Sequence, residues 1–395
     1  MLVAGSASLL DSAAIISVGS ALPLWRSELR LDDIEVGMVS ATMTIAIALG
    51  ALAGGWVADR VGRRRVFAAT VGLYAAGAAL VALSDSWTTL VVGVAVLGLG
   101  SGADLPASIA LVADRVPPQL RGRMVAATHV MWTIGIVLAS AAAFAVSPLG
   151  LTGMRAVFAL LSLAALATLA ARRRAMPAAP PALVSRPSED GPAEVSGRPG
   201  GIRILIAIAL FYLLYTLVAN TFGSFRTYLL VTVGGASQSL ATAIAFGVTL
   251  VGLVGTLAFS VIADSRWRRR VYPLAGLALV CSQVMLALTV GQSLASTVAA
   301  LVLYALAYPY VGEGLYKVWA QESVSSAARA TFQGATIAAA RAAAALFALV
   351  TPSLLARDPA ALFWLLAAIA ATAVAVGWRS RAGRRPADTS APRRT

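Results

Sequence analysis

The strongest constraint on the fold is a series of long apolar runs that fill almost the whole chain. Hydrophobic residues make up 59% of the 395 residues, and charged residues only 12%. About 20 consecutive apolar residues are enough to cross a bilayer as a helix. Twelve such runs follow one another, at roughly 2–25, 35–58, 66–84, 87–112, 124–146, 151–171, 204–233, 239–263, 271–291, 295–319, 331–355 and 360–378. A soluble core cannot bury this much apolar surface, so the sequence predicts a polytopic membrane protein.

The length and uniformity of the runs predict helices, because barrel strands are shorter and alternate in polarity. The first run begins almost at Met1, lacks a basic flank and carries Asp11 in its middle, so we interpret it as a membrane helix and not as a cleaved signal. The lone Cys281 and the lone His129 exclude a disulfide framework and a cysteine- or histidine-rich metal site. No metal and no other cofactor is expected.

The arginines predict the orientation of the chain. The net charge is +14, and the basic residues gather after the second, fourth, sixth, eighth and tenth runs and in the C-terminal tail. In the first of the opposite connections, Arg26 and Arg30 are balanced by acidic residues. This is the positive-inside pattern, with a contribution from anionic lipid headgroups, and it needs no nucleic-acid partner. We therefore expect a multi-pass protein of the cell membrane with both termini in the cytoplasm.

Two related charged turns divide the chain. The turn after the second run, from Gly54 to Arg65, contains D-R-V-G-R-R-R, and a degraded copy follows the eighth run from Ala263 to Arg270. Their aspartates, Asp59 and Asp264, lie about 205 positions apart, which indicates two homologous halves. Residues 172–202 begin with three arginines and are rich in proline, as a flexible linker would be. The predicted organisation is a six-helix bundle (1–171), a cytoplasmic linker (172–202), a second six-helix bundle (203–378) and a cytoplasmic tail (379–395).

A second pair of motifs leads to a family resemblance. The fourth run closes with D-x-x-P-x-x-x-R-G from Asp114 to Gly122, and the tenth closes with Glu322 and Arg329 at the same spacing of acid and arginine. Together with the D-R-x-G-R-R turn, this pattern resembles the major facilitator superfamily. The segments Leu97–Pro106 and Gly312–Glu322 resemble the sugar porters, in particular their bacterial inositol-transporter-like members. The resemblance implies an all-α membrane protein of twelve helices in two pseudo-symmetric halves that carries out secondary active transport, and we expect it to be a monomer.

The charged turns predict a gate at the cytoplasmic rim. Acids at helix ends and arginines beyond the turn can form a network between the two halves that is intact when the cytoplasmic side is closed. The alternative is plain positive-inside topology. The predicted gating residues are Gly55, Asp59, Gly62, Arg63, Arg64, Asp114, Arg121, Asp264, Arg268, Glu322 and Arg329.

Two acids inside the runs are candidates for proton coupling. A charge at the bilayer centre costs about 2.5–3.5 kcal/mol on insertion scales, so each one needs a partner or a function. Asp11 lies near the middle of the first run, flanked by Ser12 and Ser17, and Asp104 follows a glycine-rich segment and precedes Pro106. A carboxylate whose surroundings change between outward and inward states can bind and release a proton. The alternative is a carboxylate that is permanently paired within the bundle.

A polar and aromatic set predicts the substrate site. Glu313 and Lys317 are four apart and can form an intrahelical ion pair. Sugar sites combine such polar groups with aromatic rings. The predicted substrate-binding residues are Asp104, His129, Trp132, Asn220, Glu313, Tyr316 and Trp319. Two arginines stay ambiguous: Arg226 either belongs to this stripe or extends to the outer surface, and Arg341 is either a counter-ion for Asp104 or Glu313 or a structural partner.

The functional prediction is a secondary transporter of a sugar or an inositol-like polyol, working by alternating access with proton symport. A proton-coupled exporter of a drug or secondary metabolite is the alternative, because it can use the same acids and Val94 occupies a position where many proton-coupled sugar porters carry arginine. A non-transporting sensor would need a larger soluble segment than the linker and tail offer. An enzyme is not expected, since the connections contain no nucleophile and base, metal cluster or phosphate-binding loop.

Overall fold

The computed structural model contains helices throughout the part of the chain that it describes, and no strand there. It describes residues 2–61, 63–115, 118–175, 201–262, 265, 267–324 and 326–379. Within these ranges, the side chains of 2–7, 55–56, 58–61, 63–65, 67, 104–115, 118–130, 172–175, 321 and 326–331 lie outside the description. The predicted linker therefore falls almost entirely outside the described residues, and the tail does so beyond Arg379.

The helices follow the predicted apolar runs closely. They are α1 (Leu2–Glu28), α2 (Asp33–Val61), α3 (Arg63–Ala82), α4 (Trp87–Arg115), α5 (Pro118–Val146), the short 3-10 helix η1 (Ser147–Leu149), α6 (Gly150–Ala175), α7 (Gly201–Thr232), α8 (Gln238–Ile262), α9 (Trp267–Thr289), α10 (Leu294–Val311), α11 (Glu313–Ser323), α12 (Ser326–Arg357) and α13 (Pro359–Gly377). Among the described residues, nine helical stretches are long and apolar enough to span a membrane.

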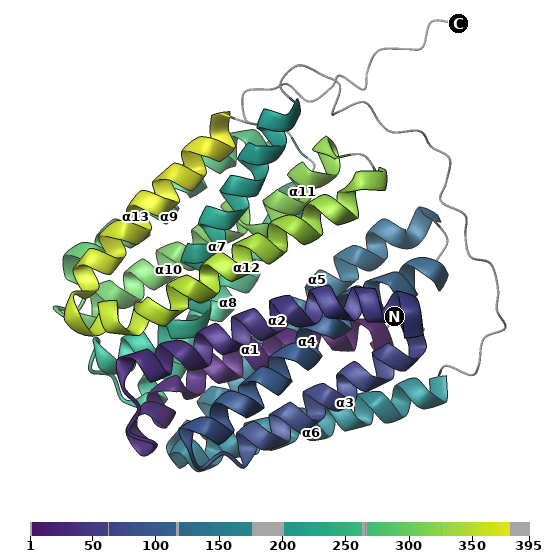
Figure 1. Cartoon of the computed structure of the whole chain (residues 1–395). Helices are drawn as coiled ribbons and strands as arrows, with labels where there is room; N and C mark the ends of the chain where they lie inside the picture. The colour runs from purple at the N-terminus through teal and green to yellow at the C-terminus, as the bar shows by residue number, and fades with distance from the viewer. Residues whose placement is uncertain are drawn as a thin grey trace, which may run out of the picture.

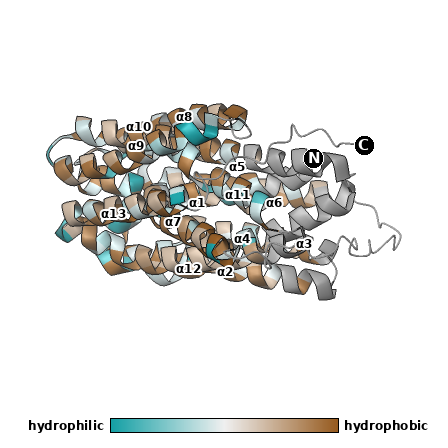
Figure 2. Cartoon of the chain, turned by 90° about the horizontal axis from the view of Figure 1, so that it is seen from above, coloured by the Kyte–Doolittle hydropathy of each residue, from teal (hydrophilic) through white to brown (hydrophobic). Residues whose placement is uncertain are grey.

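The helices form two groups that face each other (Figure 1). The N-terminal group contains α1 to α6, and the C-terminal group contains α7 to α13. The groups meet mainly where α1 packs on α7, α2 on α12 and α5 on α8. The outward surface is strongly apolar (Figure 2), with exposed side chains such as Leu83, Leu163, Val261 and Leu274. An apolar exterior is what a protein solvated by lipid tails requires.

The tenth predicted run differs from expectation, because it is divided into α10 and α11. The break lies at Gly312, whose backbone is extended (φ −110°, ψ −152°). A side chain at this position would meet the hydroxyl of Tyr215 and the carbonyl of Tyr308, each at 2.5 Å. Pro309 precedes the break and lacks the N–H that would continue the helical hydrogen bonds. The break sets the direction of α11 independently of α10.

The glycine-rich segment of α4 forms a tight seam inside the N-terminal group, as its composition predicts. Side chains added at Gly98 or Gly102 would collide with α2, at Ala46 and at the backbone of Ile47, and one at Gly100 would collide with the backbone of Tyr74 on α3. Small residues let helix backbones approach in a membrane, where van der Waals packing replaces the hydrophobic effect as the source of stability. The seam therefore binds α2, α3 and α4 into one unit.

The two groups are in close contact at one end of the bundle, the end that carries the α1–α2 and α7–α8 turns, which we call the closed end. A side chain added at Gly19 of α1 would lie 2.8 Å from the carbonyl of Ser224 on α7, and one at Gly37 of α2 would collide with the carbonyl of Leu349 on α12. Gln238 Nε2 also donates to the Ser20 carbonyl at 2.9 Å. Little space remains between the groups at this level.

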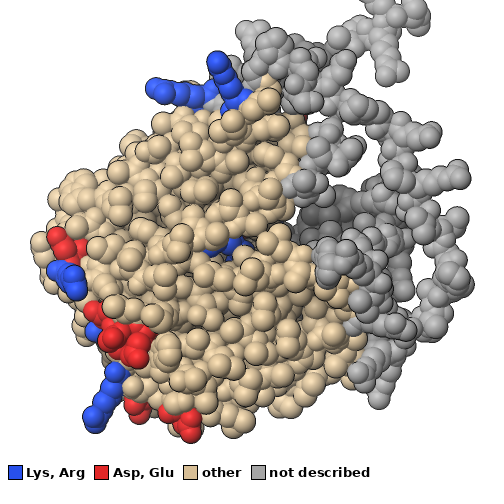
Figure 3. Space-filling view, viewed as in Figure 1, with Lys and Arg blue, Asp and Glu red and all other residues tan. Residues whose placement is uncertain are grey.

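Charged side chains reinforce the closed end. Arg26 Nη2 pairs with Asp33 Oδ1 at 2.8 Å, and Arg26 Nη1 donates to the hydroxyl of Tyr228 on α7. The Tyr228 hydroxyl in turn donates to Asp33 Oδ1 at 3.3 Å. We call Arg26, Asp33 and Tyr228 the closed-end cluster. Acidic and basic side chains gather at this end of the molecule in Figure 3, where polar headgroups and water can solvate them.

Candidate functional site

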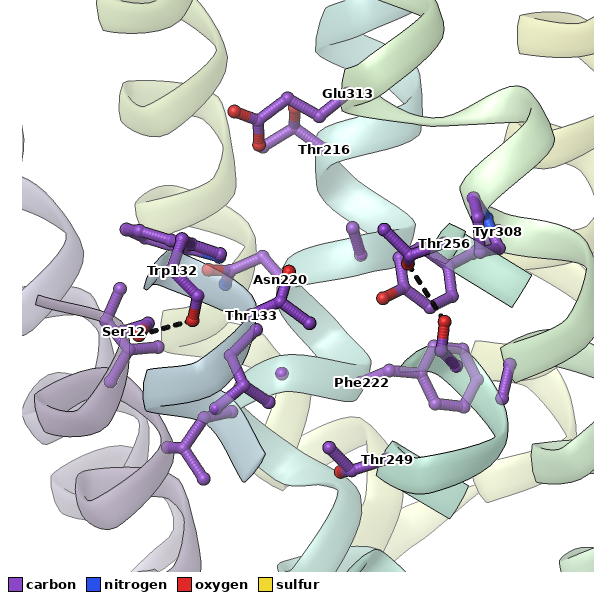
Figure 4. Close-up of a pocket in the computed structure, with 18 of the residues that line it drawn as sticks. Ser12, Trp132, Thr133, Thr216, Asn220, Phe222, Thr249, Thr256, Tyr308 and Glu313 are labelled. Atoms are coloured by element: carbon purple, nitrogen blue, oxygen red, sulfur yellow. Dashed lines mark hydrogen bonds between the residues drawn. The ribbon is translucent and has the colours of Figure 1, made fainter. Parts of the chain in front are cut away.

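A cavity of about 260 Å³ lies between the two groups of helices. The N-terminal group contributes residues of α1, α2 and α5, and the C-terminal group contributes residues of α7, α8, α10, α11 and α12. Figure 4 shows Ser12 and Trp132 on one side of the cavity and Phe222, Thr256 and Tyr308 on the other. When one group tilts against the other, a site at their interface opens to one side of the membrane and closes to the other.

Aromatic rings from α7 and α10 form one wall of the cavity. Phe222 stacks on Tyr304 with ring centroids 4.2 Å apart, and Tyr304 stacks on Tyr308 at 5.7 Å. Tyr212 and Tyr215 of α7 also line the cavity. Stacked rings of this kind present flat apolar faces with hydroxyl groups at their edges. The wall therefore suits a small ring-shaped solute that has both apolar and polar faces.

Hydroxyl and amide groups supply hydrogen-bonding positions around this wall. The Ser12 hydroxyl donates to the Trp132 carbonyl at 2.7 Å, which connects α1 to α5 across 120 residues of sequence (Figure 4). Asn220, Thr216 and Thr133 also face the cavity. An amide can donate and accept at once, and a hydroxyl can rotate to do either. The lining can therefore bind solute hydroxyl groups of varied orientation.

Arg226 faces the cavity and does not extend to the outer surface, which resolves one ambiguity of the sequence. Its Nη2 donates to Thr249 Oγ1 of α8 at 3.0 Å. Thr249 Oγ1 lies 3.4 Å from Ser140 Oγ of α5, so the arginine is connected to both groups. The sequence alone does not predict this position of the Arg226 side chain, because an arginine six residues before the end of a helix can reach either water or a neighbouring helix.

Glu313 and Lys317 form the predicted intrahelical ion pair on α11, with Lys317 Nζ 2.7 Å from Glu313 Oε1. Glu313 lines the cavity (Figure 4), and its side chain is 41% exposed. The cavity is thus accessible to solvent from the α11 side, which is the end opposite the closed end. Arg341 of α12 also lines the cavity, and among the described residues it forms no ion pair.

Comparison with known proteins decides the family. The model of the Major Facilitator Superfamily matches residues 4–352. The chain belongs to the Major Facilitator Superfamily. The resemblance predicted from the charged turns is therefore confirmed, and so is the all-helical membrane fold.

Individual relatives of this facilitator are transporters. It is 28% identical over 368 residues to the minor myo-inositol transporter IolF of Bacillus subtilis (strain 168), an alignment that covers 90% of this chain and 83% of that protein. It is 34% identical over 118 residues to the niacin transporter NiaP of Acinetobacter baylyi (strain ATCC 33305 / BD413 / ADP1), which is 30% of this chain and 27% of that protein. The expectation that the chain is not an enzyme is confirmed by its family.

The fold of the facilitator is that of solved sugar transporters. The crystal structure of a D-xylose-proton symporter superimposes with a TM-score of 0.81 at 18% identity, covering 96% of this chain and 98% of that chain. The inward-open conformation of the xylose transporter XylE from E. coli superimposes with a TM-score of 0.78 at 16% identity, covering 96% and 95%. At these identities the likeness concerns the fold.

The predicted substrate-binding residues differ in where they lie relative to the cavity. Trp132, Asn220 and Glu313 line the cavity. Tyr316 and Trp319 lie behind the wall: Tyr316 stacks on the cavity-lining Tyr212 at 4.0 Å, and Trp319 packs against Phe211 and Tyr272 at 4.9 and 5.5 Å. Asp104 and His129 have side chains outside the described residues. The position behind the wall follows from the break at Gly312, which sets the rotation of α11.

Asp11 is buried next to the cavity without lining it. Its side chain is 3% exposed and accepts a hydrogen bond from the Ser101 hydroxyl of α4. The Tyr74 hydroxyl of α3 donates to the neighbouring Leu10 carbonyl at 2.7 Å. Ser12 lines the cavity, whereas Asp11, the residue before it, lies on the side of α1 that faces α4 and the rest of the N-terminal group.

One ion pair of the predicted gate is visible. Arg268 Nη2 lies 2.8 Å from Glu322 Oε1, so the acid that ends α11 pairs with the first turn of α9. Both residues belong to the C-terminal group, and in this conformation the pair does not join the two groups. The remaining gating candidates have side chains, or whole residues, outside the described part of the chain: Gly55, Asp59, Gly62, Arg63, Arg64, Asp114, Arg121, Asp264 and Arg329.

Proposed function

We propose that this facilitator is a proton-coupled symporter that carries a small hydroxylated ring solute of the sugar or polyol type across the cell membrane by alternating access. The observation that carries the proposal is the cavity itself, built from both groups of helices and lined by an aromatic wall and by hydroxyl and amide groups. Two proteins that it resembles, a myo-inositol transporter and a D-xylose-proton symporter, support this solute class.

The closed end is proposed to face the outside of the cell. The arginines of the first turn of α9, Arg268 to Arg270, lie at the other end, where the positive-inside rule places basic residues. Both termini are then cytoplasmic, and the conformation is inward-facing. A single cysteine at the exposed Ser86 of the α3–α4 turn, in a Cys281→Ser background, is expected to react with a membrane-impermeant maleimide added to intact cells. Labelling only after the cells are opened would reverse the orientation.

Asp11 is proposed to carry the coupled proton. Its carboxylate is buried inside the N-terminal group, next to Ser12, whose side chain lines the cavity, so a movement of α1 during the cycle changes its surroundings. Alternating hydration changes the proton affinity of a carboxylate between the two access states. The proton and the solute can then bind and leave together.

The test is uptake into proteoliposomes of a panel of labelled sugars, polyols and their acids, with and without an inward proton gradient. Wild-type protein is expected to accumulate at least one of them only when the gradient is present. Asp11→Asn is expected to abolish accumulation and to spare counterflow exchange, whereas Asp85→Asn, in the exposed α3–α4 turn, behaves as wild type. Gradient-driven accumulation by Asp11→Asn would remove this residue from proton coupling.

A further inference from the structure

The charges that the described residues bring to the cavity do not balance. Among the described residues that line it, the charged ones are Arg226, Arg341 and Glu313. Glu313 is already matched by Lys317, at 2.7 Å on its own helix. The two arginines therefore leave the described lining with an excess of positive charge. A basic side chain is visible at the bottom of a central hollow in Figure 3.

Arg226 is held in place and still has unused donors. Its Nη2 is bound by Thr249, while its Nε is buried and has no hydrogen-bond partner. Arginine carries five N–H donors in a fixed planar fork, and this fork matches the two oxygens of a carboxylate. A neutral hydroxyl can satisfy one such donor but does not compensate the charge. A desolvated guanidinium without an anion is costly inside a membrane protein, so its position calls for an anionic ligand.

Arg341 lies at a second polar corner of the same space. A recess of about 20 Å³ adjoins the main cavity and shares Thr44, Asn220, Ser224 and Arg341 with it. The recess is also lined by Ser40, whose hydroxyl is buried and has no hydrogen-bond partner in the structure. Donors from α2, α7 and α12 therefore converge beside the second arginine. This corner is suited to oxygen atoms of a solute, charged or neutral.

We propose that the transported solute is an anion: a hydroxylated six-membered ring that carries one carboxylate, bound by Arg226 and attracted by Arg341. The aromatic wall of Phe222, Tyr304 and Tyr308 covers a face of the ring, and Asn220 and the threonines bind its hydroxyl groups. This inference rests on the proposed function and narrows its solute class. It places the carboxylate at the guanidinium fork of Arg226, where Thr249 fixes the orientation.

The test uses matched pairs of acid and neutral compound, with binding measured on the purified full chain by tryptophan fluorescence and thermal stabilisation. D-glucuronate is compared with D-glucose, and quinate with myo-inositol. At least one acid is expected to bind at a concentration about tenfold or more below that of its neutral partner, which corresponds to one strong charge-assisted contact. Equal or weaker binding of both acids relative to their partners overturns the proposal.

Variants at the arginines identify the site. Arg226→Gln is expected to lower the affinity for the preferred acid about tenfold or more and to leave that of its neutral partner unchanged. Arg226→Lys keeps the charge without the fork and is expected to fall between the wild type and Arg226→Gln. Arg203→Gln changes an arginine of the same helix outside the cavity and is the matched control. Wild-type acid binding by both Arg226→Gln and Arg341→Gln overturns the proposal.

Two further measurements keep the result unambiguous. The unliganded variants are compared by thermal unfolding. Where an arginine variant does not fold, it is replaced by Thr249→Val, which keeps both arginines and removes the hydroxyl that orients Arg226. This variant is expected to weaken binding of the acid more than binding of its neutral partner. Gradient-driven uptake is then measured in proteoliposomes for the same pairs. Uptake of a neutral compound without its acid overturns the anion proposal and leaves the proposed function standing. Absence of gradient-driven uptake for every compound overturns the proposed function as well.

Discussion

Two seams in this facilitator bring helix backbones equally close, yet they differ in what surrounds them. Inside the N-terminal group, Gly98, Gly100 and Gly102 of α4 lie against the backbone of α2 and α3 and against Ala46, within one bundle of helices. Between the groups, Gly19 and Gly37 make the same kind of contact, but the closed-end cluster and the hydrogen bond from Gln238 to the Ser20 carbonyl lie beside it. Backbones packed inside one group have no water to replace their contacts, whereas polar groups near the water can exchange their partners for water. The first seam is suited to be permanent and the second to be reversible.

The largest expected effect is on the permanent seam. Gly102→Val places a side chain against the backbone of Ile47, and overpacking of this kind costs roughly 1–3 kcal/mol or more where backbone must move. We expect a lower thermal unfolding temperature and loss of monodisperse protein in size-exclusion chromatography. Gly72→Val is the control, because an added Cβ there meets nothing within 4 Å. Equal stability of the two variants would contradict a permanent seam.

The next effect concerns the reversible seam. Gly19→Val places a side chain 2.8 Å from the Ser224 carbonyl and obstructs the closed end, while each group keeps its own packing. We expect near-normal stability and a loss of transport of about tenfold or more, since the cycle requires the closed conformation. Gly247→Val is the matched control, because its added side chain meets open space. Normal uptake by Gly19→Val would show that the contact is not needed for transport.

A smaller effect is expected for the closed-end cluster. The Arg26 and Asp33 side chains are 33% and 26% exposed, so their pair is worth at most about 1 kcal/mol, or about fivefold in population. Asp33→Asn is expected to open the closed end more often. A cysteine introduced at Ile16 in the cavity reports this opening. A maleimide added outside the cell should label it up to about fivefold faster in Asp33→Asn than in the wild type, and Asp85→Asn is the control. Unchanged labelling would assign the cluster a purely local role.

The smallest effect is expected at the other end of the molecule. Arg268 and Glu322 lie within one group and are 23% and 41% exposed, so Glu322→Gln removes a weak contact that does not join the groups in this conformation. Transport is expected to change by less than about twofold. A loss of tenfold or more in uptake would show instead that Glu322 takes part in closing the cytoplasmic side, as its motif predicts.

Local spacing predicted some parts of the site correctly. Residues four apart on a helix share a face, and this was enough for the ion pair between Glu313 and Lys317. The glycines of α4 predicted close packing because the absence of a side chain has the same consequence in any helix. The position of Arg226 beside Thr249 was not predictable in this way, because it depends on which helix lies next to α7 and at what height.

The sequence by itself determined the class of the protein, since runs of apolar residues long enough to cross a bilayer can be satisfied only by helices in lipid. It also determined the family, through charged turns whose residues are close in the chain. Only the tertiary structure decided which side chains meet in the cavity. Ser12 reaches Trp132 across 120 residues and Arg268 reaches Glu322 across 54, and the break at Gly312 turns Tyr316 behind the wall. Such contacts depend on helix tilt, rotation and partner choice, which arise from packing over the whole chain and are not contained in any local segment.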